Sequence, residues 1–153
     1  MALTCLMRLG IVAEIGAVTV GCSDTLGPPE GFGLAAATNS CGPLGEPAVE
    51  IFLASEPIES VPPDAPYVRI YIRQSVDELA GETWVLAGAD ADGVAGYYST
   101  TTDSELASSG AVMISEVDDD NNIEGLVNVV FPTAGRVRGE FRAEWVQRNI
   151  GCL

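Results

Sequence analysis

The stretch Arg136-Val137-Arg138-Gly139-Glu140-Phe141-Arg142-Ala143-Glu144-Trp145-Val146 decides the fold class of this chain of 153 residues. Small or apolar residues alternate with charged residues along it. A period of two places these two sets on opposite faces of a β-strand. One face of the strand is therefore apolar and the other is charged. A strand with one wet face is typical of an antiparallel sheet, because parallel sheets are covered on both faces.

Two further strands are expected before this one, over Ala111–Val117 and Ile123–Phe131, and they complete a three-stranded meander. Residues 118–122 and 132–135 are rich in Asp, Asn, Pro and Gly, which favours turns between the strands. A slip of one residue in the third strand would bury its charged face, so its register is strongly specified. Such a meander needs a second layer to cover its apolar side.

Earlier segments supply further short strands separated by turn residues. The expected strands are Val49–Leu53, Tyr67–Arg73, Thr83–Ala87 and Val94–Thr102, the last two forming a hairpin around Asp90–Gly93. Ser75 begins a single helical turn that Gly81 ends. The sequence thus predicts an all-β domain over residues 48–153, an antiparallel β-sandwich or small barrel of about seven strands.

The composition excludes many function classes. Asp and Glu number 22 against seven Arg, no Lys and no His, for a net charge of −15. This balance argues against nucleic acid and anionic lipid surfaces as partners. Without His and Lys, the Ser-His-Asp and Cys-His mechanisms, HExxH zinc sites and P-loops are impossible. We therefore expect no enzyme; the alternative is a hydrolase that relies on paired carboxylates.

The first residues look like a targeting segment. Arg8 precedes an apolar run over residues 9–20, which is too short to span a bilayer and suits a signal peptide. The run ends in Thr19-Val20-Gly21-Cys22, which resembles the lipobox of bacterial lipoproteins. The resemblance implies a signal peptide over residues 1–21 and an acylated Cys22 that anchors the protein to a membrane of the cell envelope, outside the cytoplasm. A conventionally cleaved secretory peptide and a retained N-terminal helix are the alternatives.

Residues 22–47 are rich in Gly, Pro, Ala and Ser. This composition favours a flexible or extended tether between the lipid anchor and the domain. No cofactor is implied by any motif in the chain.

The cysteines are interpreted in the light of the same resemblance. Cys5 would leave with the signal peptide and Cys22 would carry lipid, so Cys41 and Cys152 would remain as a pair in an oxidising compartment. A disulfide between them would join the entry of the domain to its exit, with the first strand near the last. The alternative is two buried free thiols, and metal ligation by two isolated cysteines is less favoured.

The acidic turn offers a candidate metal site. Asp118, Asp120 and Asn122 cluster oxygen ligands that suit Ca²⁺. The EF-hand pattern fails here, because Ile123 stands in place of the sharp-turn Gly. The alternative is an ordinary solvated hairpin turn.

A second candidate site lies on the strand at 67–73. Arg69, Tyr71 and Arg73 alternate on the face opposite Val68 and Ile70, which makes them a candidate ligand surface on an otherwise acidic protein. Ion pairing with carboxylates is the competing role for exposed arginines.

These observations favour a secreted, lipid-anchored envelope protein that acts as a non-enzymatic binding or structural module. A calcium-dependent adhesion or carbohydrate-binding module is the first alternative, and a carboxylate-based hydrolase is the second. A protein or glycan partner is not specified by any motif.

Overall fold

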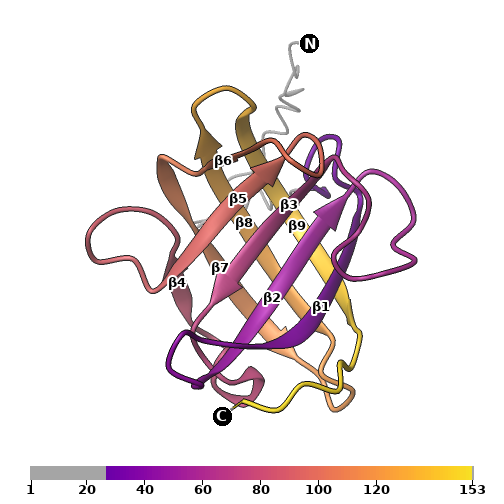
Figure 1. The fold of residues 1–153 in the computed structure, drawn as a ribbon, viewed down its shortest axis with the longest axis vertical. Coiled ribbons are helices and arrows are strands. Elements are labelled where there is room, and N and C mark those ends of the chain that lie inside the picture. Colours follow the sequence, from indigo (N-terminus) through magenta and orange to yellow (C-terminus); the bar gives the residue numbers. More distant parts are fainter. Residues whose placement is uncertain (1–26, 153) are drawn as a thin grey trace, which may run out of the picture.

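The computed structural model describes residues 27–152, which form one mixed β-sheet of nine strands that curls into a half-barrel (Figure 1). The strands are β1 (Leu34–Cys41), β2 (Pro47–Ala54), β3 (Tyr67–Ile72), β4 (Thr83–Val85), β5 (Gly93–Tyr98), β6 (Ser104–Leu106), β7 (Ser109–Val117), β8 (Ile123–Phe131) and β9 (Gly135–Trp145). Their order across the sheet is β4-β7-β8-β9-β1-β2-β3-β5-β6. The all-β prediction is confirmed. The expected count of about seven strands is wrong, since residues 27–152 form nine.

The meander at the end of the chain is confirmed. β7 pairs antiparallel with β8, and β8 pairs antiparallel with β9 along its whole length. In β9 the apolar positions Val137, Phe141 and Ala143 are buried, while Arg138 and Glu140 are exposed. Gly139 also faces inward, where the chain at residues 27–29 crosses so closely that a Cβ would lie 2.4 Å from the Pro29 nitrogen.

β1 corrects the expectation of a tether over residues 22–47. Leu34–Cys41 is a strand that pairs antiparallel with β2 and, at Ala36 and Ala37, parallel with β9. In Figure 1 this strand and β9 lie side by side. Apart from Thr38 its residues, mainly Ala, Asn and Ser, carry little strand propensity, but it is hydrogen-bonded on both edges, and such tertiary pairing overrides propensity. The sheet is therefore mixed and not purely antiparallel.

The expected hairpin of residues 83–102 is wrong. β4 pairs with β7 at one end of the sheet, and β5 pairs with β3 and β6 at the other end. Gly93 had suggested a turn, but its role is a close approach to β3, because a Cβ there would lie 2.4 Å from the Tyr71 carbonyl oxygen. β6 is absent from the predicted strands, because residues 102–109 are mostly polar and poor in strand formers.

The core lies inside the curl of the sheet. Apolar side chains from both halves of the sheet meet there, with Ile51 and Leu53 of β2 and Ile70 of β3 fully buried. The predicted inward face of β3 is thus confirmed. The predicted single turn of helix is also present, as the 3-10 turn η1 (Val76–Glu78).

A second, smaller cluster lies on the outer face of β2 and β3. Phe52 and Tyr67 are buried there, and Ile58 and Val61 of the irregular connection at residues 55–66 pack against them. β2 is consequently buried on both faces, in agreement with its continuous apolar run Ile51-Phe52-Leu53-Ala54.

Candidate functional site

The candidate ligand surface on β3 lies partly in a hollow on the outer face of the sheet. The hollow has a volume of about 420 Å³, within the range typical of small-molecule sites. Arg69 and Tyr71 line it, but Arg73 does not; the Arg73 guanidinium lies within 3.4 Å of the Ala91 carbonyl oxygen instead. The structure thus brings together two of the three predicted residues.

The floor of this hollow is a glycine. In the register of the sheet, Arg69 on β3 lies opposite Gly96 on β5, and Gly96 lies opposite Leu106 on β6. Gly96 has no side chain to fill the space between Arg69 and Leu106, although the Tyr98 ring comes within 3.1 Å of the position that a Cβ would take. Tyr71 and Val94, which also face each other across β3 and β5, form one wall of the hollow.

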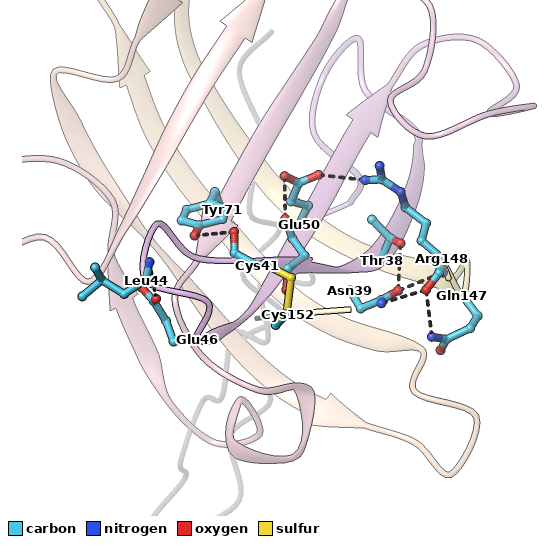
Figure 2. Close-up of a disulfide and its surroundings, with 11 residues drawn as sticks. Thr38, Asn39, Cys41, Leu44, Glu46, Glu50, Tyr71, Gln147, Arg148 and Cys152 are labelled. Carbon is cyan, nitrogen blue, oxygen red and sulfur yellow. Dashed lines mark hydrogen bonds and ion pairs between the residues drawn. A yellow bond between two sulfur atoms is a disulfide. The ribbon is translucent and has the colours of Figure 1, made fainter. Parts of the chain in front are cut away.

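The remaining wall comes from the β1–β2 turn. Gly42 and Pro43 line the hollow, and the Tyr71 hydroxyl lies 3.4 Å from the carbonyl oxygen of Cys41, the last residue of β1 (Figure 2). Burial raises the pKa of Tyr71, and the Glu46 carboxylate in the same turn raises it further. Tyr71 is therefore a neutral hydroxyl at physiological pH.

Arg69 is held in place on several sides. Its guanidinium forms an ion pair with Glu50 of β2, and its Cζ lies 5.7 Å from the centre of the Tyr71 ring. Burial by itself would lower the pKa of Arg69, but the Tyr98 and Glu50 side chains outweigh burial and raise the pKa. Its side chain is still 36% exposed, so the guanidinium is both positioned and reachable.

Glu50 is the functional candidate that sequence reasoning missed. It is only 6% exposed, although alternation places it on the outer face of β2 together with Phe52. Its carboxylate also accepts a hydrogen bond from Ser40 and lies 3.8 Å from the Arg148 guanidinium. A buried carboxylate needs such partners. No local pattern could indicate its burial, because the covering residues come from β1, β3 and the chain end.

A second hollow of about 280 Å³ adjoins the first. Arg69 and Tyr98 line both hollows, and the second is also lined by Glu50, Phe52, Pro62, Tyr67 and Arg148. Tyr67 and Tyr98 stack with their ring centres 4.7 Å apart. Arg69 therefore stands at the junction of two aromatic-lined hollows.

The predicted disulfide is present and bears on this site. Cys41 and Cys152 are bonded, with their Cα atoms 5.4 Å apart. Upstream of Cys152 the last residues run along β1, where Asn39 exchanges two hydrogen bonds with the Arg148 backbone (Figure 2). The bridge thus holds Arg148 where its side chain faces Glu50.

The acidic turn is built differently from a metal site. Asp118 accepts hydrogen bonds from the Asp120 and Asn122 backbone nitrogens and from the Asn122 side chain, and it also pairs with Arg142. The side-chain hydrogen bond from Asn122 is the main reason that the pKa of Asp118 is lowered. The Asn122 oxygen accepts a hydrogen bond from the Trp145 backbone. The Asp118 and Asn122 oxygens, two of the three expected Ca²⁺ ligands, therefore stabilise the turn.

No group of three or more His, Cys, Asp or Glu side chains that could hold a metal ion occurs within residues 27–152.

A third hollow, of about 460 Å³, has two glutamates in its lining. Glu124 and Glu140 line it beside Arg142. Glu124 forms an ion pair with Arg142, and its side chain is 40% exposed. Glycosidases keep one carboxyl protonated by burying it, and neither of these carboxylates is buried. This arrangement resembles a solvated ion-pair surface more than an acid-base pair.

Cys22 and the expected signal peptide lie outside the described residues. Among the described residues, no helix has the length and apolar character required to cross a membrane.

Comparison with models of protein families, with curated proteins and with solved structures finds no match to this chain.

Proposed function

We propose that this protein is a non-enzymatic binding module of the bacterial cell envelope, held outside the cytoplasm by lipid on Cys22, with its binding surface on the outer face of β3 and β5. The observation that carries the proposal is the hollow over Gly96. There a positioned, partly exposed arginine stands beside aromatic and aliphatic side chains. Concave sites that combine apolar walls with a few placed polar groups are the usual form of ligand sites.

Two further features support an extracytoplasmic location. The segment Thr19-Val20-Gly21-Cys22 resembles a lipobox. The Cys41–Cys152 disulfide is of the kind that persists in oxidising compartments and is rare in the cytosol. The absence of His and Lys from the sequence supports a binding role over catalysis.

The location is tested by expressing the full chain in a bacterium and fractionating the cells. We expect the protein in the membrane fraction, with a mass spectrum showing an acylated Cys22 as the N-terminal residue. The Cys22→Ala variant should lose the acyl group and leave the membrane fraction. An unmodified N-terminus that retains Met1, with the protein in the cytosol, would refute the proposal.

A further inference from the structure

We infer that the hollow over Gly96 binds a small amphiphilic carboxylic acid, with the ligand carboxylate on Arg69 and its apolar body directed across β5 toward Leu106. The inference rests on the proposed binding role and adds the chemical class of the ligand. Arg69, Gly96 and Leu106 are cross-strand partners on β3, β5 and β6, and this row of residues supports the inference.

The charged end of the site is Arg69. One of its guanidinium nitrogens, Nη2, pairs with Glu50, while a guanidinium offers five N–H donors in all. Arg148 also approaches Glu50, so two guanidinium groups share one carboxylate. These three side chains together therefore carry one net positive charge, although the whole chain is strongly acidic. A single carboxylate on the ligand would balance it, and guanidinium groups match carboxylates in geometry.

The apolar end of the site is formed by Val94 and Leu106. They are 45% and 65% exposed, respectively, and both line the hollow. Single exposed apolar residues are common on protein surfaces and do not by themselves indicate a binding site. Here, however, they form one side of a concavity that has a positioned arginine on its other side. That arrangement provides burial for an apolar body attached to an anionic group.

The register of the sheet sets the length of the ligand. Arg69 and Leu106 are two strands apart, a Cα separation of about 10 Å at the usual spacing between strands. A carboxylate on Arg69 thus leaves room over Gly96 for a short alkyl chain or one aromatic ring. We expect affinity to rise from acetate through butyrate to hexanoate, since each added CH₂ buries more apolar surface.

The test uses 4-phenylbutyrate and its neutral analogue 4-phenylbutyramide, titrated into the oxidised domain and followed by the amide NMR signals of each residue. The acid should shift the signals of Gly96, Val94 and Leu106 and should bind about tenfold more tightly than the amide, because charge-assisted hydrogen bonds are stronger than neutral ones. Equal affinity of acid and amide, or shifts confined to other residues, would overturn the inference.

Variants distinguish a ligand site from a structural ion pair. Arg69→Gln should remove the preference for the acid over the amide, whereas Arg142→Gln, on an arginine also paired with carboxylates, should leave it unchanged. Glu50→Gln should strengthen binding of the acid without affecting the amide, since it removes the carboxylate that competes for Arg69. A purely structural Glu50 would give no such gain.

Filling the floor of the hollow gives a test that does not depend on charge. A Cβ at Gly96 would lie 3.1 Å from the edge of the Tyr98 ring, so the ring would have to shift by only a few tenths of an ångström. Gly96→Ala should therefore fold and should weaken binding of acid and amide alike. If both ligands bind over Gly96 with equal affinity, the ligand class is wrong and the binding role stands. If Gly96→Ala leaves the binding of both probes unchanged, the location of the site is wrong as well.

Discussion

The outer faces of β9 and β3 belong to one sheet, yet they have opposite characters. On β9 the outer side chains are charged and exposed, and the outer salt bridges of Arg142 lie at the surface. On β3 and its neighbour β2 the outer face carries buried Phe52, Glu50 and Tyr67, together with two hollows. An outward position in an alternating strand is thus solvated only where no other segment covers it. The difference shows that hollows form where the outer face of the sheet is partly covered, and there we place the proposed binding site.

The largest expected effect on stability comes from truncating a side chain on the partly covered outer face of β2 and β3. Phe52→Ala should lower the free energy of unfolding by about 3–5 kcal/mol, as for other buried phenylalanines, because Phe52 is 1% exposed. Glu140→Ala on the outer face of β9 should change it by less than about 0.5 kcal/mol. Urea unfolding of both variants measures the contrast. Similar effects at the two positions would show that the two faces do not differ.

The disulfide joins the chain that follows β9 to the end of β1, and its removal should have the next largest effect on stability. Cys41→Ser with Cys152→Ser should lower the free energy of unfolding by about 2–5 kcal/mol, because the bridge spans 111 residues and constrains the unfolded chain. The measurement is urea unfolding of the double variant against the oxidised protein. Faster hydrogen exchange at Asn39 and Arg148 should accompany the loss, since the chain end would detach from β1. Unchanged exchange there would contradict the role of the bridge in holding Arg148.

Arg69 on the outer face of β3 and Arg142 on the outer face of β9 both pair with carboxylates. Replacing either one should change the free energy of unfolding less than the Phe52 and disulfide changes above. Arg69→Met leaves the buried Glu50 carboxylate with the more distant Arg148, so we expect a loss of about 1–3 kcal/mol. Arg142→Met removes exposed pairs and should cost about 0.2–1 kcal/mol. Thermal and urea unfolding measure the loss of stability in both variants. A greater loss for Arg142→Met would reverse the comparison.

The smallest effect concerns the acidic turn next to β9 and depends on pH. The pKa of Asp118 is lower in the folded chain, so the unfolded chain binds more protons in acid. Its stabilising contribution is present above the unfolded value of about 3.9 and is lost as pH falls through the folded pKa. Asp118→Asn removes this titration, so the variant should lose stability less steeply than wild type below about pH 4.

The control for the acidic turn is Asp119→Asn in the same turn, which should follow the wild-type curve. Parallel curves for wild type and Asp118→Asn would contradict the lowered pKa. Added Ca²⁺ should leave the unfolding midpoint unchanged, because the Asp118 and Asn122 oxygens already accept hydrogen bonds.

The sequence by itself determined the elements whose signal is local. Alternation of period two placed the inner residues of β3 and β9 and set the three-stranded meander, because side-chain direction in a strand depends only on position along it. The cysteine pairing was also reached from the sequence, although by way of the lipobox resemblance.

Tertiary structure alone decided how the strands outside the meander pair and what covers their outer faces. β1 became a strand because β2 and β9 bond to both its edges, and β4 and β5 found partners at opposite ends of the sheet. Glu50 and the hollow over Gly96 arise from residues far apart in the chain. Periodicity reports the face on which a side chain lies, whereas the neighbours that bury it are long-range contacts that no short stretch of sequence encodes.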